Sequence, residues 1–285
     1  MGSAKPPKMD TKMKSKNNSK QLKQVVLEKY DRIGQNSPFN SANKPGCCSP
    51  SSCCDTIDYE VFAEDYSPLE GYQSEADLGL GCGLPTVFAH IQPGHTVVDL
   101  GSGAGNDCFV ARQLTGETGN VIGIDFSPAM VKRAQENVRK LNFTNVHFYQ
   151  GDIEQIPLDD YTADVVVSNC VMNLVPDKNR AFSETFRILK PGGHFSISDV
   201  VTVGDLPPKL QKDAEFYAGC VSGATDLDEY LATVKMAGFT NLKIQKQREI
   251  NLPDKILKSV LNEQEVSDFR KSKTGIYSIT LFAEK

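Results

Sequence analysis

The sequence lacks any apolar run of the roughly 18 residues that a membrane-spanning helix needs. It also lacks the apolar core of a secretory signal peptide, and it shows no internal repeat. The formal net charge of −5 leaves no basic excess for a large nucleic-acid-binding face. We therefore expect a cytoplasmic protein without membrane or nucleic-acid partners. Its 285 residues suffice for one α/β domain with additions or for two small domains.

The first 22 residues are rich in lysine and nearly free of apolar side chains, which is typical of a disordered basic leader. A nucleic-acid-binding arm is the alternative for this run. The next segment, 23–33, has apolar residues at helical spacing and ends at Gly34, so it predicts a helix. We assign residues 23–78 to this helix and a cysteine-rich loop.

A glycine-rich turn follows an apolar segment in Val97-Val-Asp-Leu-Gly-Ser-Gly-Ala-Gly105. This pattern predicts a buried strand that contains Asp99, then a turn where backbone N–H groups face a ligand. The turn is G-x-G-x-G and not the dinucleotide fingerprint G-x-G-x-x-G. About twenty residues later a second strand ends at Asp125, a position from which a carboxylate can accept hydrogen bonds from ribose hydroxyls. The pattern indicates a nucleoside-type cofactor.

Polar residues also follow the third and fourth predicted strands. Asp152 could accept a hydrogen bond from the amino group of an adenine whose ring Ile153 covers, although an aspartate after glycine also caps turns. Asn169 and Cys170 end the fourth strand, at the edge where open α/β sheets bind ligands. We expect these groups to converge on one ligand.

Strand and helix patterns alternate from the glycine turn onward, which predicts a Rossmann-like, doubly wound and mostly parallel α/β sheet over 79–205. Residues 206–285 predict an α+β region. The predicted helices cover 106–115, 128–141, 177–190, 207–220, 226–237 and 253–261. The predicted strands cover 121–125, 146–150, 163–169, 193–200 and 277–283.

Five segments in order, VVDLGSGAG, GIDFS, GDIEQIP, SNCVMNLV and LKPGGHFSISDV, resemble class I S-adenosylmethionine-dependent methyltransferases over residues 75–203. The resemblance implies that S-adenosyl-L-methionine is the methyl donor. The candidate cofactor-binding residues are Asp99, Gly101, Ser102, Gly103, Gly105, Asp125, Phe126, Met130, Asp152, Ile153 and Asn169.

Eight cysteines in a chain expected to be cytoplasmic should mostly be thiols, so their placement indicates metal or redox chemistry. Cys108 is interpreted as a buried apolar thiol. The other seven lie at glycine-rich turns, at a strand end or in one loop: Cys47, Cys48, Cys53, Cys54, Cys82, Cys170 and Cys220.

Clustered thiolates favour soft, thiophilic centres. Zinc is one candidate, because the spacing of Cys48 and Cys53 suits it, but the four histidines are scattered and no second ligand pair stands out. A trivalent arsenical is the other candidate. Arsenic(III) binds three thiolates as a pyramid and keeps a lone pair that can attack a sulfonium methyl group.

The segments LGCGLP, DLGSGAGNDC, SNCVMNLV and GCVSGA together resemble arsenite S-adenosylmethionine methyltransferases from about residue 25 onward. The resemblance implies that Cys170 and Cys220 hold the arsenical. It also implies that Cys82 and one of the loop cysteines complete a trithiolate site, to which 206–285 contributes through Cys220. The loop candidates are Cys47, Cys48, Cys53 and Cys54, with Cys48 and Cys54 the catalytic choices.

A disulfide that forms during turnover is further implied by the resemblance, and with it a need for a thiol reductant such as thioredoxin or glutathione. Two positions depart from the family pattern: Leu80 stands where many members have tyrosine, and Asn106 where many have arginine. Two other functions stay open. One is methylation of a small organic acceptor such as a quinone precursor, and the other is a non-catalytic thiol-rich metal sensor.

Overall fold

A computed structural model describes residues 10–35, 63–212, 223–272 and 274–285. Within them lies a seven-stranded sheet in the order β3-β2-β1-β4-β5-β7-β6. β1 to β5 pair in parallel, and β7 runs antiparallel to both β5 and β6. The strands are β1 (Thr96–Leu100), β2 (Asn120–Asp125), β3 (Val146–Gln150), β4 (Ala163–Asn169), β5 (Leu189–Val203), β6 (Thr240–Glu249) and β7 (Gly275–Glu284). The predicted Rossmann-like, mostly parallel sheet is confirmed.

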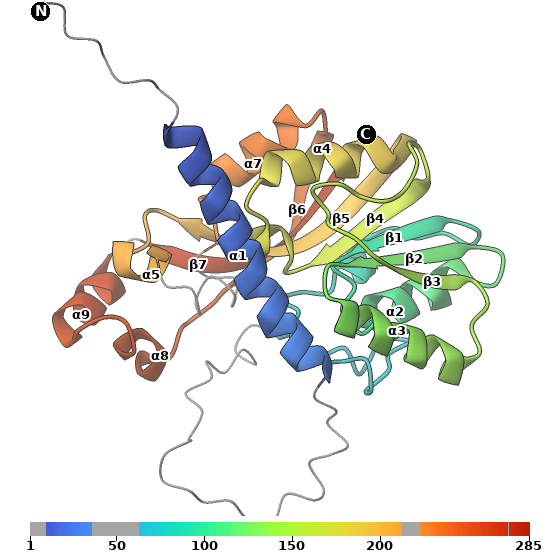
Figure 1. Ribbon diagram of the computed structural model, residues 1–285, viewed down its shortest axis with the longest axis horizontal. Helices are drawn as coiled ribbons and strands as arrows, with labels where there is room; N and C mark the ends of the chain where they lie inside the picture. The colour runs from blue at the N-terminus through green and yellow to red at the C-terminus, as the bar shows by residue number, and fades with distance from the viewer. Residues whose placement is uncertain (1–9, 36–62, 213–222, 273) are drawn as a thin grey trace, which may run out of the picture.

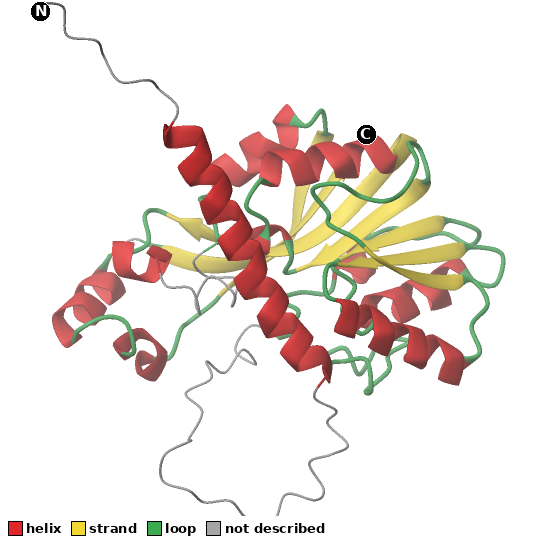
Figure 2. Ribbon diagram, viewed as in Figure 1, coloured by secondary structure: helices red, strands yellow, loops and turns green. Residues whose placement is uncertain are grey.

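Helices cover both faces of this sheet, α2 and α3 on one side and α4 and α7 on the other (Figures 1 and 2). Successive strand residues point to opposite faces, so Val97 enters the core beside α2 and α3 while Val98 enters the core beside α4 and α7. Burial on both faces explains the nearly continuous apolar sequence of β1. The helices are α2 (Asn106–Thr115), α3 (Pro128–Leu141), α4 (Lys178–Ile188) and α7 (Leu227–Met236).

The predicted bounds of α2, α3, β3 and β4 agree with the structure. The Ser127 side chain caps α3 by accepting a hydrogen bond from the N–H of Met130, and Pro128 occupies the first turn. β5 begins at Leu189, earlier than the predicted 193, because Leu189 already pairs with Ala163 of β4. The pairing register with β4 shifts there, and Gly192 has a positive φ of 78°.

Helix α1 (Asp10–Gln35) begins before the predicted 23–33 segment, so the structure places residues 10–22 of the expected leader in a helix. Lysine, methionine and glutamine are good helix formers, and neither proline nor glycine interrupts the run before Gly34. α1 packs against α3 and crosses in front of the sheet (Figure 1). Residues 1–9 lie outside the described part of the chain.

The C-terminal part adds α5 (Pro208–Lys212), α8 (Asp254–Lys258) and α9 (Glu263–Lys271), which lie together at one end of the molecule in Figure 1. The predicted helix 207–220 is described only as far as residue 212, and the helix predicted over 253–261 ends at Lys258. α9 was not predicted. Its signal is a capping box, in which Asn262 and Glu265 each bond the other's backbone N–H.

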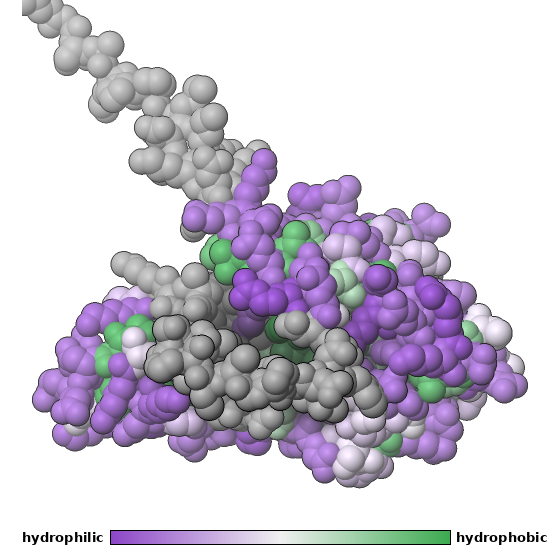
Figure 3. Space-filling view, turned by 60° about the horizontal axis from the view of Figure 1, so that its bottom comes forward, coloured by the Kyte–Doolittle hydropathy of each residue, from purple (hydrophilic) through white to green (hydrophobic). Residues whose placement is uncertain are grey.

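Two short 3₁₀ turns, η3 (Pro85–Phe88) and η4 (Met172–Leu174), follow the segments that carry Cys82 and Cys170. The face drawn in Figure 3 is mainly hydrophilic, with hydrophobic side chains gathered in small areas. Among the residues that the structure describes, no helix combines the length and apolar character of a membrane span.

Candidate active site

The glycine turn after β1 requires its glycines for steric reasons. The N–H groups of Gly101 and Ser102 donate to the carbonyl of Ile124, at 2.7 and 3.1 Å. Gly101 has a φ of +74°, and a Cβ there would lie 2.3 Å from Cγ2 of Val171. By contrast, a Cβ at Gly103 would meet nothing within 4 Å. The turn thus presses against Val171 at one point and is open at another.

Asp125 connects the end of β2 to this turn. One of its carboxylate oxygens accepts the N–H of Gly103 at 2.8 Å, and the other accepts the N–H of Ser127 at 2.8 Å. Burial raises the pKa of Asp125 to about 6, although these hydrogen bonds act in the opposite direction. The predicted ribose-binding residue is therefore buried and held by backbone donors on both oxygens.

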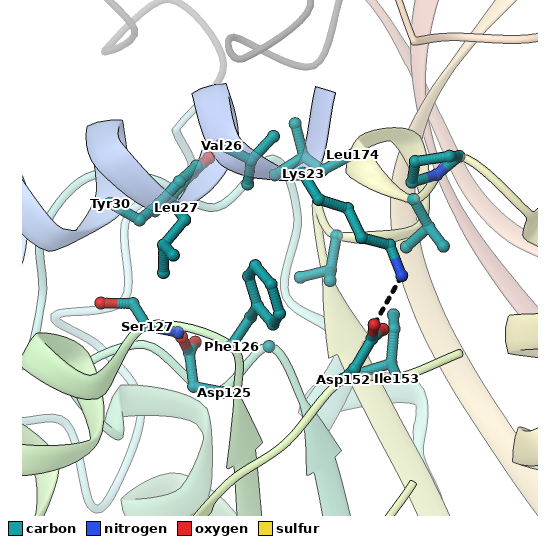
Figure 4. A pocket seen from close by; sticks show the side chains of 14 residues that line it. Lys23, Val26, Leu27, Tyr30, Asp125, Phe126, Ser127, Asp152, Ile153 and Leu174 are labelled. Atoms are coloured by element: carbon teal, nitrogen blue, oxygen red, sulfur yellow. Dashed lines mark hydrogen bonds and ion pairs between the residues drawn. The ribbon is translucent and has the colours of Figure 1, made fainter. Parts of the chain in front are cut away.

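A pocket of about 600 Å³ lies between α1 and the carboxyl ends of β2 and β3 (Figure 4). It contains four of the residues predicted for the nucleoside part of a cofactor, namely Asp125, Phe126, Asp152 and Ile153. The opposite wall was not predicted, since it comes from α1: Lys23, Val26, Leu27 and Tyr30. Mainly apolar side chains with a few polar groups among them line this pocket, as is usual for small-molecule sites.

Lys23 reaches from α1 to the carboxylate predicted to contact adenine. Its Nζ lies 2.5 Å from Oδ2 of Asp152 (Figure 4). The same Nζ lies 2.7 Å from Oε2 of Glu154. Burial lowers the pKa of Lys23, but the hydrogen bonds and charges of the two acids outweigh this effect and raise it above its ordinary value. Sequence patterns offered no signal for this contact, because it joins segments 129 residues apart.

A second pocket, of about 620 Å³, adjoins the first, and both are bordered by Tyr30, Gly101, Val171 and Leu174. Six predicted site residues line it: Gly101, Ser102, Gly103, Met130, Asn169 and Cys170. The hydroxyl oxygen of Ser102 is buried and has no hydrogen-bond partner among the described residues. A buried orphan hydroxyl at a pocket wall is suited to a polar ligand group.

Asp99 and Gly105 line neither of these two pockets. Asp99 lies within the sheet and accepts a hydrogen bond from the thiol of Cys108 at 3.2 Å. Burial, followed by the charge of Asp107, raises the pKa of Asp99 well above its usual range. Cys108 is fully buried, as predicted. Asp99 thus links β1 to α2, the helix that follows the glycine turn.

The structure brings Cys82 and Cys170 into one buried cluster. Cys170 has a φ of +61°, a strained value for a residue with a side chain, and its N–H donates to the carbonyl of Ser198 at 2.7 Å. The N–H of Cys82 donates to Oδ1 of Asn169 at 2.9 Å, and its carbonyl accepts the hydroxyl of Ser278. Asn169, which directly precedes Cys170 in the sequence, thus holds the backbone of Cys82 in place.

A buried phenol, Tyr230 on α7, donates its hydroxyl proton to Oδ2 of Asp199 on β5 at 3.1 Å. Burial raises the pKa of Tyr230 well above its usual range, and the charge of Asp199 acts in the same direction.

The remaining predicted thiols cannot be placed. Cys47, Cys48, Cys53, Cys54 and Cys220 lie outside the described residues. Within the described ranges, no group of three or more His, Cys, Asp or Glu residues is arranged to hold a metal ion.

Two further site residues, Tyr66 and Asp107, were not predicted. The Tyr66 hydroxyl lies 2.8 and 2.9 Å from the two carboxylate oxygens of Asp107, and Nδ2 of Asn169 lies 2.5 Å from that hydroxyl. Burial raises the pKa of Asp107 to about 6 against the effect of these bonds. The position of Asp107, directly after the glycine turn, was a usable signal, whereas Tyr66 lies in an irregular acidic segment without one.

Residues 91–261 match the protein family described as "Methyltransferase domain". The arsenite methyltransferase of Halobacterium salinarum is 40% identical over 236 residues, which cover 80% of this chain and 60% of that protein. The one of Aquipseudomonas alcaligenes is 32% identical over 256 residues, which cover 85% of this chain and 69% of that protein.

A crystal structure of an arsenic(III) S-adenosylmethionine methyltransferase from Chlamydomonas reinhardtii is similar, with a TM-score of 0.62 and 35% identity over 72% of this chain and 67% of that chain. This chain spans only about 60 to 70% of the length of these relatives. By the family match and these identities, the chain belongs to the arsenite methyltransferase family of methyltransferase-domain proteins.

Proposed function

We propose that this chain transfers the methyl group of S-adenosylmethionine to trivalent arsenic that is bound by cysteine thiolates. The observation that carries the proposal is that Cys82 and Cys170 belong to one buried cluster and that Cys170 borders the pocket of the glycine turn. Cys170 borders the same pocket as Gly101–Ala104, and Asn169 holds the backbone of Cys82 beside it. Soft thiolates and a candidate donor pocket therefore adjoin.

The two adjoining pockets fit such a donor. Asp125 would accept from the ribose hydroxyls, since each of its oxygens keeps a lone pair beyond the one used by a backbone donor. Phe126 and Ile153 supply apolar surface for an adenine ring, and Asp152 would accept from its amino group once Lys23 yields. The orphan hydroxyl of Ser102 gives the second pocket a polar contact. When bound, S-adenosylmethionine supplies an electrophilic methyl group on a sulfonium.

The protein's own part is mainly to bind and orient. Thiolates at Cys82 and Cys170 would hold arsenic(III) with its lone pair free, and positioning of this kind can supply a large share of a rate enhancement. We propose that Cys220 and one of the loop cysteines (Cys47, Cys48, Cys53, Cys54) complete the arsenic site. Methyl transfer to the lone pair takes arsenic to the pentavalent state, and two of these thiolates return it to the trivalent state as they become a disulfide. That disulfide has to be reduced before the next turnover, so we expect a thiol reductant such as thioredoxin or glutathione to be required in the cytoplasm.

The test compares Cys170→Ser with Cys108→Ser, a matched change of a buried thiol that lies in the core and keeps a donor for Asp99. Each protein is incubated with arsenite, donor and reductant, and methylated arsenicals are separated and measured by mass spectrometry. Calorimetry with S-adenosylhomocysteine measures the donor site separately. We expect Cys170→Ser to lose methylation and to keep the calorimetric affinity within about twofold.

Methylation of arsenite by Cys170→Ser at the wild-type rate would refute the thiolate site. A wild-type protein that methylates a small phenolic acceptor and not arsenite would favour the organic-acceptor alternative. Tight arsenic binding without any affinity for S-adenosylhomocysteine would identify a sensor.

A further inference from the structure

A continuous chain of hydrogen bonds connects the glycine turn to the Cys82 segment. Asp107, in the first turn of α2, follows the glycine turn directly and is partly buried at the wall of the second pocket. The Tyr66 hydroxyl lies 2.8 Å from Oδ2 of Asp107, and Nδ2 of Asn169 lies 2.5 Å from the Tyr66 oxygen. Asn169 then reaches the Cys82 segment with both ends of its amide.

The chemistry of each group determines which atom donates in each of these hydrogen bonds. An ionised carboxylate only accepts, so the Tyr66 hydroxyl donates its single proton to Asp107 and its oxygen accepts from Asn169. The second amide proton of Asn169 goes to the carbonyl of Gly83 at 2.8 Å. Its Oδ1 accepts the N–H groups of Cys82 at 2.9 Å and of Gly83 at 3.3 Å. The Tyr66 hydroxyl also lies 3.1 Å from the carbonyl of Gly83, and Nδ2 of Asn169 lies 3.3 Å from Oδ2 of Asp107, so these groups form one connected network around the Cys82 segment.

The segment around Cys82 packs tightly against its neighbours. A Cβ at Gly81 would lie 2.6 Å from Nδ2 of Asn169, and one at Gly83 would lie 2.5 Å from Oγ of Ser198. Cys82 itself has no exposed surface. The segment therefore lies flat against Asn169 and β5, and its position depends on how the Asn169 amide is oriented.

We propose that Tyr66 and Asp107 are positioning residues that act through Asn169. They hold the Cys82 segment in place, so that the Cys82 thiol stays in the buried cluster that contains Cys170. The effect of these two residues on the kinetics of arsenite methylation rests on the proposed function. Their effect on the position of the Cys82 segment rests on geometry alone. Loss of the Tyr66 hydroxyl removes the shorter donor to Asp107, one acceptor of the Asn169 amide and the contact of the hydroxyl with the carbonyl of Gly83. A buried polar group that loses its partner shifts a local opening equilibrium by about tenfold or more.

The experiment uses the full chain with Tyr66→Phe, which keeps the ring, and with Asp107→Asn as a second, isosteric variant. Tyr149→Phe is the matched control, since this tyrosine on β3 is exposed. Reduced proteins are pulsed with iodoacetamide under native conditions, and peptide mass spectrometry reports the modification rate of each cysteine. Buried thiols react from locally opened states, so the rate reports the opening equilibrium.

We expect Tyr66→Phe and Asp107→Asn to raise the modification rate of Cys82 by about tenfold, while Tyr149→Phe leaves it unchanged. Cys108 serves as the internal reference, and its rate in Tyr66→Phe should stay within about twofold. In turnover, the two variants should raise the KM for arsenite more than they weaken S-adenosylhomocysteine binding in calorimetry.

Three results would overturn the proposal. Equal acceleration of Cys82 and Cys108 in Tyr66→Phe would mean a general loss of stability. An unchanged Cys82 rate would mean that the hydrogen bonds do not hold the segment. A loss of S-adenosylhomocysteine affinity with an unchanged Cys82 rate would assign the series to the donor pocket. The modification assay needs no substrate, so it still decides the matter if the chain proves not to methylate arsenite.

Discussion

Replacement of Asp199 by asparagine is expected to remove much of the pH dependence of folding stability between pH 5 and 7. Asp199 lies on β5 with 1% of its surface exposed. Its carboxylate accepts the N–H of Val200 at 3.0 Å and the hydroxyl of Tyr230 at 3.1 Å. Burial raises its pKa to about 7, against the smaller opposing effects of Lys178 and of these hydrogen bonds.

The sign follows from proton binding. The unfolded chain holds this proton with a pKa of about 3.9, so between pH 4 and 7 the folded protein binds more protons than the unfolded one. The stability that this provides is complete below the unfolded pKa and is lost as the pH rises through the folded one. A shift of about 3 units amounts to roughly 4 kcal/mol, of which roughly 2 kcal/mol falls between pH 5 and 7.

The free energy of unfolding is measured by urea titration at pH 5, 6, 7 and 8, followed by far-UV circular dichroism. The difference between wild type and Asp199→Asn cancels the slopes that Asp99, Asp107 and Asp125 contribute to both proteins. Tyr230→Phe should have the opposite effect on the pH dependence. It removes a hydrogen-bond donor from the ionised carboxylate of Asp199, so the free energy of unfolding should fall more steeply as the pH rises. Parallel curves for wild type and Asp199→Asn would refute a raised pKa at this position.

Gly101→Ala should lower the melting temperature strongly and abolish S-adenosylhomocysteine binding, because its Cβ would meet Val171 at 2.3 Å, whereas Gly103→Ala should cost only the strain of its φ, about 1 kcal/mol. Thermal melts and calorimetry decide this, and equal effects of the two changes would contradict the steric argument. Lys23→Met should raise the affinity for S-adenosylhomocysteine by about two- to fivefold, because it frees a carboxylate oxygen of Asp152. A weaker affinity in the same calorimetric titration would mean that Lys23 does not compete with the ligand.

Local patterns were sufficient for the five parallel strands, for β7 and for the glycine turn, but not for β6, whose partly buried positions do not alternate. The bounds of α2 and α3 follow from signals within a few residues, such as Ser127 and Pro128 at the start of α3. The strands with two buried faces are recognisable because their apolar runs are short and bounded by turns. The acids Asp125 and Asp152 could be placed near one ligand because the carboxyl ends of parallel strands share an edge.

Only the tertiary structure decided which side chains complete the pocket and how the thiols are held. Lys23 reaches Asp152 across 129 positions, and Tyr66 meets Asn169 across 103. Such contacts arise when helices and loops are buried against a sheet that has already brought distant segments together, and no local periodicity encodes them. The sequence therefore determined the cysteines and the turn that the chemistry needs, and the fold decided that Asn169 joins them.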